Sequence, residues 1–277
     1  MKIRDLLTSL STPQVVRSEV RMLIGHVANR DRAWLAAHDD TELSANQYAA
    51  LVDLTKRRTH GEPMAYLLGQ REFFGRTFRC TPAALIPRPE TEHLVEHALT
   101  LIAKNTHAGA ILDMGTGTGC IAITLALERP NAQVAALDVS ADALALAREN
   151  ALNLGANNLE FIASNWFSAI ASDARFELIV SNPPYIVPGD AHLTEGDLRF
   201  EPEIALADAI DGLESYRQLA LGAKKHLKKG GWLVVEHGYD QGESVPSLLR
   251  KNGFADVQTQ LDLAGHPRVT AARWHAL

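Results

Sequence analysis

Residues 1–70 carry apolar side chains at helical spacing and contain no alternating strand pattern. The positions that repeat three or four apart after Pro13 are Val16, Val20, Leu23, Ile24 and Val27. Ser44, a residue type that caps helices, precedes a second long helical pattern, and a shorter one lies between the two. We therefore expect an all-helical domain over residues 1–70.

From residue 108 onward, short apolar runs alternate with amphipathic stretches, which is typical of a parallel sheet covered by helices on both faces. The runs that predict strands are 110–115, 133–138, 159–164, 176–182 and 231–238. The stretches that predict helices are 120–129, 141–155 and 213–228. Two further strands, 255–263 and 267–277, are joined by a turn at Gly265. The pattern therefore predicts an α/β domain with a mostly parallel, seven-stranded sheet and an antiparallel hairpin at its edge.

Between these two regions, glycines and prolines interrupt the chain. The run EFFGRTFRC predicts a short hairpin across Gly75. We interpret residues 71–90 as a hairpin and linker, followed by the α/β domain at 91–277.

Composition narrows the class of protein. The chain has 277 residues, of which 46% are hydrophobic and 22% charged, as in soluble globular proteins. Residues 1–70 hold 9 basic and 8 acidic side chains, and the remainder holds 18 and 25, for a net charge of −6. A broad surface for nucleic-acid phosphates needs clustered cations. We therefore expect no direct nucleic-acid substrate.

The cysteine and apolar patterns point to an intracellular protein. Cys80 and Cys120 lie far apart without a CxxC spacing, so we expect neither a disulfide framework nor a metal site. No apolar run approaches the about 18 residues that span a bilayer, and the opening stretch lacks the apolar region of a secretory signal. We expect a cytoplasmic protein without membrane contact.

A glycine-rich loop connects the first strand of the α/β domain to the following helix. It consists of Gly115, Thr116, Gly117, Thr118 and Gly119. Glycines allow positive φ and let a ligand approach the backbone, although a tight strand-to-helix turn needs them as well. The spacing is G-x-G-x-G, whereas dinucleotide-binding loops have G-x-G-x-x-G. The loop therefore suits a smaller and less anionic ligand.

Asp138 ends the second strand, 19 residues beyond Gly119. An acid at this place accepts hydrogen bonds from ribose hydroxyls. It can also cap the next helix, a role that Ser140 could fill instead. The loop and the acid together favour a nucleoside-bearing cofactor, and leave S-adenosylmethionine and a nicotinamide both open.

The fourth strand ends in Asn182, Pro183, Pro184 and Tyr185. Ligands of such sheets bind outside the carboxyl ends of the strands, so this tetrapeptide faces the same crevice as the glycine loop. Prolines remove backbone donors and leave carbonyl acceptors, and Tyr185 offers a flat aromatic face. The alternative is a proline-rich loop that merely ends a strand. The set suits a planar –NH₂ group, such as an amide or an adenine amine.

The nitrogen of such a group is a poor nucleophile, because its lone pair is delocalised. The Asn182 side-chain oxygen and the Pro183 carbonyl can each accept one N–H, which directs the lone pair toward an electrophilic methyl group. Tyr185 would stack on the planar group. These acceptors predict a methyl transfer in which the protein contributes alignment and electrostatics.

The chain resembles the release factor glutamine N5-methyltransferase family, also called PrmC or HemK. The matching stretches are LIPRPETE at 85–92, ILDMGTGTG at 111–119, ALD at 136–138, NWF at 165–167, SNPPY at 181–185, RFEP at 199–202 and EHG at 236–238. The resemblance implies a Rossmann-like class I methyltransferase that uses S-adenosylmethionine. It implies that the substrate is the glutamine of the Gly-Gly-Gln motif in peptide chain release factors, in translation termination.

The resemblance also implies roles for individual residues. Residues 115–119 would contact the cofactor, Asp138 would hold its ribose, and Trp166 would pack near its adenine unless it is an ordinary core residue. Residues 182–185 would hold the glutamine amide, with Asn182 also near the donor methyl. Arg88, Pro89 and the RFEP segment would line the substrate entrance, and the N-terminal helices would dock the release factor. One departure is Asn165, where the family usually has an acid.

Four other functions remain open at this point. One is a non-enzymatic nucleoside-binding scaffold, which would leave the acceptor cluster at 182–185 unexplained. A sister enzyme methylates a glutamine of a ribosomal protein, and only the resemblance separates it from the first interpretation. An adenine amino-methyltransferase needs the same acceptors, but also a basic groove or recognition domain. A nicotinamide- or flavin-binding redox protein is disfavoured by the glycine spacing.

Overall fold

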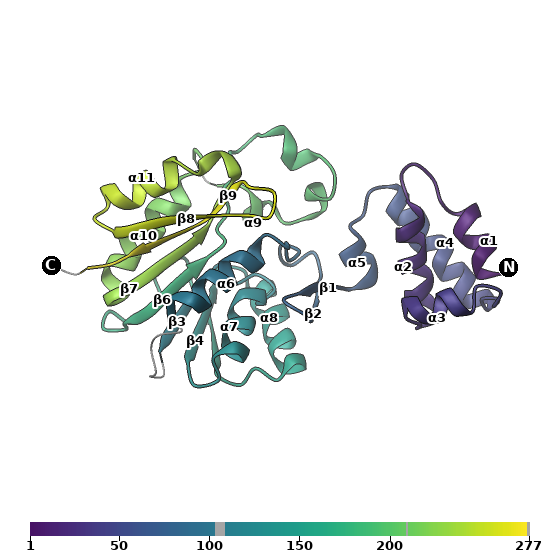
Figure 1. The fold of residues 1–277 in the computed structure, drawn as a ribbon, viewed down its shortest axis with the longest axis horizontal. Helices are drawn as coiled ribbons and strands as arrows, with labels where there is room; N and C mark the ends of the chain where they lie inside the picture. Colours follow the sequence, from purple (N-terminus) through teal and green to yellow (C-terminus); the bar gives the residue numbers. More distant parts are fainter. Residues whose placement is uncertain (103–108, 209, 276–277) are drawn as a thin grey trace. The chain divides into compact units, whose positions relative to one another are not determined.

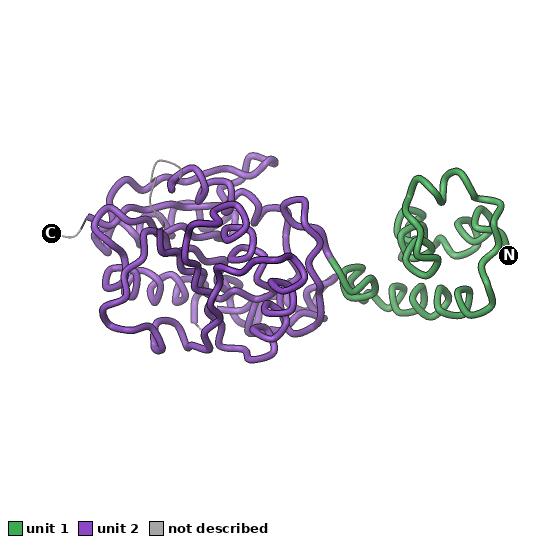
Figure 2. Tube along the Cα trace, turned by 90° about the horizontal axis from the view of Figure 1, so that it is seen from below, with its two compact units in different colours: residues 1–70 green, residues 71–277 purple. Residues whose placement is uncertain are grey.

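The computed structural model describes residues 1–102, 109–208 and 210–275. They form two compact units, Met1–Gln70 and Arg71–Leu277, which Figure 2 shows in different colours. Figure 1 gives the order of the helices and strands along the chain. Within the described residues, no helix has the length and apolar character that crossing a bilayer requires.

The N-terminal unit is helical, as predicted. Its helices are α1 (Ile3–Ser9), α2 (Arg17–Ala28), α3 (Arg32–Ala37), α4 (Ala45–Thr59) and α5 (Met64–Leu68). Ser44 caps α4: its hydroxyl accepts from the Gln47 amide at 3.3 Å, while Gln47 Oε1 accepts from the Ser44 amide at 2.9 Å. Leu23 and Leu51 are fully buried in a core that all five helices share.

The second unit contains the predicted seven-stranded sheet, in the order β5-β4-β3-β6-β7-β9-β8. The strands are β3 (Ala110–Met114), β4 (Gln133–Asp138), β5 (Leu159–Ala163), β6 (Phe176–Ser181), β7 (Leu227–Glu236), β8 (Ala255–Leu261) and β9 (Pro267–Arg273). β9 pairs antiparallel with both β7 and β8, and the other pairs are parallel. The edge hairpin is therefore confirmed.

Helices cover both faces of this sheet, as Figure 1 shows. The longer helices are α6 (Thr91–Ile102), α7 (Cys120–Glu128), α8 (Ala141–Leu154), α10 (Glu214–His226) and α11 (Ser244–Lys251). Neighbouring strand residues point to opposite faces: Ile111 packs in the core that includes α6 and α7, and Leu112 in the core that includes α10 and α11. Burial on both faces explains why these strands are continuously apolar.

The remaining segments are short. They are α9 (Glu203–Leu206) and three 3₁₀ turns, η1 (Ala191–Thr194), η2 (Leu198–Phe200) and η3 (Tyr239–Gln241). The hairpin across Gly75 consists of β1 (Gln70–Phe73) and β2 (Arg76–Arg79). Phe73 and Phe78 pack edge to face in the core with α6 and α7, and the Arg79 amide donates to Asn150 of α8 at 2.8 Å. The hairpin is thus integrated into the second unit.

Candidate functional site

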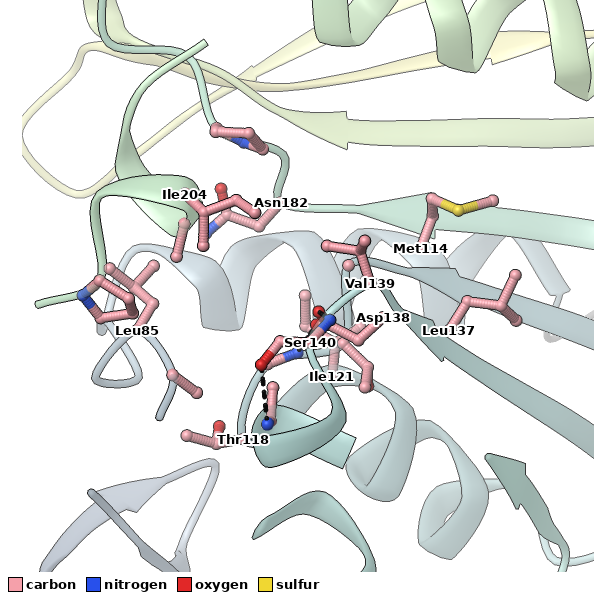
Figure 3. A pocket seen from close by; sticks show the side chains of 18 of the residues that line it. Leu85, Met114, Thr118, Ile121, Leu137, Asp138, Val139, Ser140, Asn182 and Ile204 are labelled. Carbon is pink, nitrogen blue, oxygen red and sulfur yellow. Dashed lines mark hydrogen bonds between the residues drawn. The ribbon is translucent and has the colours of Figure 1, made fainter. Parts of the chain in front are cut away.

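A cavity of about 390 Å³ lies at the carboxyl ends of β3, β4 and β6. The predicted site residues that line it are Gly115, Thr116, Gly117, Thr118, Asp138, Trp166, Asn182 and Pro184. Gly119, Pro183 and Tyr185 are not among its lining residues. In Figure 3, Asn182 and Ile204 lie together, apart from Asp138 and Ser140. The cavity therefore has two polar ends, which we call the cofactor end (Gly115–Thr118 and Asp138) and the acceptor end (Asn182–Pro184).

The first three backbone amides of the glycine loop donate to the end of β4. The amides of Gly115 and Thr116 donate to the Leu137 carbonyl at 2.9 and 2.8 Å. The Gly117 amide donates to Asp138 Oδ2 at 2.9 Å. A pyrophosphate needs such amides as free donors. The loop therefore fits an uncharged nucleoside better than a dinucleotide, which disfavours the nicotinamide alternative.

Gly119 differs from Gly115 in the space that its backbone leaves for a side chain. It is the N-cap residue of α7 with φ of 82°, and a Cβ there would lie 2.7 Å from Ile123 Cδ1. By contrast, a Cβ on Gly115 would meet no atom within 4 Å. Gly119 therefore closes the packing of the loop on α7, while Gly115 leaves room at the cavity wall.

Asp113 stabilises the glycine loop through hydrogen bonds, a role that could not be assigned from the sequence. Its side chain is fully buried, and Oδ2 accepts from Thr116 Oγ1 at 2.7 Å and from the Ala122 amide at 3.2 Å. Burial raises the pKa of this carboxyl to about 7, against the opposing effect of these hydrogen bonds. A carboxylate in an otherwise apolar strand was the available signal.

Asp138 is held by two backbone donors. Oδ1 accepts from the Ser140 amide and Oδ2 from the Gly117 amide, both at 2.9 Å. Ser140 itself caps α8, because its hydroxyl accepts from the Ala143 amide at 3.2 Å. A carboxylate has about four acceptor positions. Asp138 therefore keeps acceptor capacity toward the cavity, where a ribose hydroxyl could donate.

Trp166 lines the cavity and also packs against the core that contains α10. Its backbone has φ of 50°, a region that non-glycine residues rarely adopt. The Ser164 hydroxyl donates to the Trp166 carbonyl at 2.6 Å and stabilises this turn. Asn165 lines the cavity beside it. The turn thus presents an aromatic ring and an amide at the cavity wall.

At the acceptor end, Asn182 is anchored by one half of its amide group. Its Nδ2 donates to Thr91 Oγ1 at 3.2 Å. Among the described residues, none donates to Asn182 Oδ1 or to the Pro183 carbonyl. The next carbonyl, that of Pro184, accepts from the Ser215 hydroxyl at 2.8 Å. Asn182 Oδ1 and the Pro183 carbonyl therefore have no donor among the described residues, and of these two residues Asn182 lines the cavity.

Tyr185 packs with the core that contains α10. Burial, followed by the nearby Glu236 carboxylate, raises the pKa of its phenol to about 12. The ring is therefore neutral at physiological pH, and its contacts in this structure are those of a packing residue.

The RPE and RFEP stretches are joined beside the cavity. Arg88 forms an ion pair with Glu201, whose side chain is fully buried, and Glu201 Oε2 accepts from the Ile86 amide at 2.9 Å. Arg88 and Pro202, the residue that follows Glu201, both line the cavity. The ion pair thus holds two separate segments together as one wall.

Two family models match the chain: "Methyltransferase small domain" over residues 91–197 and "PrmC N-terminal domain" over residues 5–69. A release factor glutamine methyltransferase from Neisseria gonorrhoeae is 47% identical and covers 96% of both chains. One from Bordetella pertussis is 48% identical and covers 97% of both chains. The solved hMettl16 catalytic domain in complex with MAT2A 3'UTR hairpin 1 has a TM-score of 0.60 at 16% identity, covering 96% of this chain and 92% of that one. That likeness concerns the fold alone.

The sheet order, the loop–acid pair and the cavity define an S-adenosylmethionine-dependent methyltransferase of the Rossmann-like class. The family models and the near-complete relatives are more specific. The chain belongs to the release factor glutamine methyltransferase family.

Proposed function

We propose that this protein transfers a methyl group from S-adenosylmethionine to the side-chain amide nitrogen, N5, of a glutamine in a release factor, within its Gly-Gly-Gln motif. The observation that carries the proposal is the acceptor end. Asn182 is anchored through its nitrogen, so that Oδ1 is available together with the Pro183 carbonyl. A primary amide has two N–H groups, which these two oxygens can accept.

At the cofactor end, Gly115–Thr118 and Asp138 are the residues that would hold the nucleoside part of the cofactor. Asp138 would accept from the ribose hydroxyls, and the Trp166 ring would pack against the adenine. Asn165 would accept from the adenine amine through a neutral oxygen. S-adenosylmethionine, when bound, supplies an electrophilic methyl group on a sulfonium.

At the acceptor end, the protein has to make a delocalised nitrogen reactive. By accepting both N–H groups, Asn182 and Pro183 fix the plane of the amide and direct the nitrogen lone pair out of it. The same two oxygens stabilise the positive charge that develops on nitrogen. The protein needs no strong base, because the proton can leave after the nitrogen has gained its methyl group. Alignment and charge stabilisation are thus the contributions of this chain.

A protein substrate also agrees with the charge of the second unit. Residues 71–277 carry 18 Lys and Arg against 25 Asp and Glu. An acidic unit of this kind does not provide the phosphate-neutralising surface that a nucleic-acid amine methylase requires. The acceptor amide is therefore a protein side chain in this proposal.

We further propose that the N-terminal unit docks the release factor. The match to the "PrmC N-terminal domain" model places this unit within the family. Several of its large apolar side chains are exposed, including Met22 on α2 and Tyr48 on α4. Exposed aromatic and methionine side chains are enriched at protein interfaces.

Mass spectrometry of the release factor tests the function. Purified protein, S-adenosylmethionine and a release factor are incubated, and the Gly-Gly-Gln peptide is analysed for one added methyl group. A release factor with glutamate in place of that glutamine is the control and should stay unmodified. An unmodified wild-type peptide, with methylated ribosomal protein or nucleic acid in parallel reactions, would overturn the substrate assignment.

A further inference from the structure

A buried carboxyl group lies beside Asn182 on the neighbouring strand. Glu236 ends β7, and the parallel pairing of Ser181 with Val235 places Asn182 and Glu236 at the same carboxyl edge of the sheet. Glu236 is 2% exposed, as is Thr91 at the start of α6. A charged side chain is rarely buried this deeply unless it is paired or has a function.

Thr91 connects Glu236 to Asn182. Its Oγ1 accepts from Asn182 Nδ2 at 3.2 Å, and the same side chain lies near enough to the Glu236 carboxylate to lower the pKa of that carboxyl. A hydroxyl has a single hydrogen, and an ionised carboxylate can only accept. Because its oxygen accepts from Asn182 Nδ2 with a lone pair, the Thr91 hydroxyl can give its hydrogen to ionised Glu236. Only the NH₂ half of the Asn182 amide can complete this arrangement.

The orientation of Asn182 matters because the two halves of its amide have nearly the same shape. Steric packing alone distinguishes them poorly, whereas hydrogen bonding distinguishes them well. With Nδ2 toward Thr91, Oδ1 is the group available to the substrate. With the amide turned over, Asn182 would present N–H groups to the N–H groups of a glutamine, and the acceptor end would lose one of its two oxygens.

We propose that Glu236 is a positioning residue that acts through Thr91 to keep Asn182 Oδ1 turned toward the substrate amide. The identity of that amide rests on the proposed function. We call the chain of hydrogen bonds from Asn182 through Thr91 to Glu236 the relay. When Glu236 is protonated, it can donate to Thr91, whose hydroxyl can then donate to Asn182 Oδ1. The direction of donation in the relay is then reversed. Ionised Glu236 is thus the active form.

The surroundings of Glu236 place this change near neutral pH. Burial raises its pKa to about 7, while the nearby Thr91 hydroxyl and Arg268 oppose the increase. Glu236 Oε2 has no hydrogen-bond partner among the described residues. The titratable and charged side chains that face this carboxyl are Arg268, Glu90, Arg88, Tyr185, Tyr216 and Cys120.

The test measures single-turnover methyl transfer to the release factor at saturating S-adenosylmethionine, from about pH 5.5 to about pH 9. The wild-type rate should rise with pH, reach half of its maximum near pH 7 and level off about one pH unit higher, because ionised Glu236 is required. Glu236→Gln keeps the shape and removes the charge. It should be slower by about 10-fold at pH 8 and should lose the inflection.

A matched pair of variants tests the connection through Thr91. Thr91→Val removes the hydroxyl with little change in volume, and should also be slower by about 10-fold and without the inflection. Thr91→Ser restores the hydroxyl and should restore both the rate and the inflection. Thermal unfolding and calorimetric binding of S-adenosylmethionine check that each variant is folded and binds its cofactor.

A readout without substrate separates this proposal from the proposed function. The Asn182 side-chain NH₂ signal in nuclear magnetic resonance, identified by its loss in Asn182→Ala, should titrate with Glu236 and should not titrate in Glu236→Gln. If the Asn182 signal titrates with Glu236 but the release factor is not methylated, the proposed substrate is rejected and the connection between Glu236 and Asn182 is retained. A pH inflection that persists in Glu236→Gln, or equal rates for Thr91→Val and Thr91→Ser, would reject the relay.

Discussion

The two ends of the cavity satisfy their polar groups in opposite ways. At the cofactor end, the amides of Gly115, Thr116 and Gly117 all donate to the end of β4. At the acceptor end, prolines remove the amides, and the oxygens of Asn182 and Pro183 accept from no described residue. At the cofactor end, the backbone amides are therefore used within the protein. At the acceptor end, two oxygens are left without a donor and can accept hydrogen bonds from a substrate.

A buried carboxyl group lies behind each end. Burial raises the pKa of Asp113 and that of Glu236 to about 7. Asp113 holds backbone and side-chain donors of the glycine loop and the first turn of α7. Glu236 acts on a single rotatable amide through Thr91. Similar carboxyl groups should therefore have different consequences when they are altered.

The largest expected effect is that of Asn182→Ala. Loss of Oδ1 removes one of two groups that align the substrate amide and stabilise its developing charge, so kcat should fall by about 100- to 1,000-fold. The dissociation constant of S-adenosylmethionine should change by less than about 3-fold, because its nucleoside is held at the other end. Single-turnover kinetics and calorimetry measure the two quantities.

Asn165→Ala is the matched control, since it removes the same side chain from the cavity wall beside Trp166. It should weaken cofactor binding more than it lowers kcat. If Asn182→Ala weakened cofactor binding as strongly as it lowered kcat, the pocket would have collapsed and the distinction between the two ends would be lost.

The pattern of apolar runs predicted this architecture well, because each strand is buried on both faces and each helix is amphipathic. The run predicted at 110–115 forms β3 (Ala110–Met114), and the helix predicted at 120–129 forms α7 (Cys120–Glu128). The insertion of β9 between β7 and β8 could not be derived. Strand order depends on pairing between distant segments, which local periodicity does not report.

The same limit applies to the site. Asp138 and Asn182 were predictable because each is a polar residue at the end of an apolar strand. Thr91 and Glu236 lie in stretches that match the family, yet their connection exists only through tertiary contacts between segments far apart in sequence. Asp113 is visible in the sequence as a carboxylate in an apolar strand, but its role follows only from its partners, a loop hydroxyl and a helix amide.

The second effect in size is that of Asp138→Ala at the cofactor end. It removes the acceptor proposed for the ribose and the partner of the Gly117 amide, so the affinity for S-adenosylmethionine should fall by about 10- to 100-fold. At saturating cofactor, kcat should stay within about 3-fold of wild type. Asp138→Asn keeps one acceptor oxygen and should be intermediate. A fall in kcat without a change in cofactor affinity would contradict this division of labour.

A smaller effect follows from the pKa of Asp113. Since folding raises this pKa from 3.8 to about 7, the native state holds a proton that the unfolded chain has released between these pH values. The contribution of Asp113 to stability is therefore full below pH 3.8 and is lost as pH rises to about 7, by up to about 1.4 kcal/mol per pH unit. Asp113→Asn should flatten this part of the pH dependence in urea unfolding. The variant should keep the inflection in the methyl-transfer rate that Glu236→Gln loses. If Asp113→Asn lost that inflection, the inflection would have to be attributed to Asp113 rather than to Glu236.

The smallest effect is expected from the proposed docking surface, and it should leave both ends of the cavity unchanged. Met22 and Tyr48 are 48% and 39% exposed on the N-terminal unit. The double variant Met22→Asp with Tyr48→Asp should raise KM for the release factor by about 5-fold, because two apolar contacts are lost, while kcat and cofactor affinity stay near wild type. Leu152→Asp on α8 is the control, as an exposed apolar side chain of the second unit with 82% exposure, and its KM should equal that of wild type. Equal KM values for the double variant and the control would remove these two side chains from the docking surface.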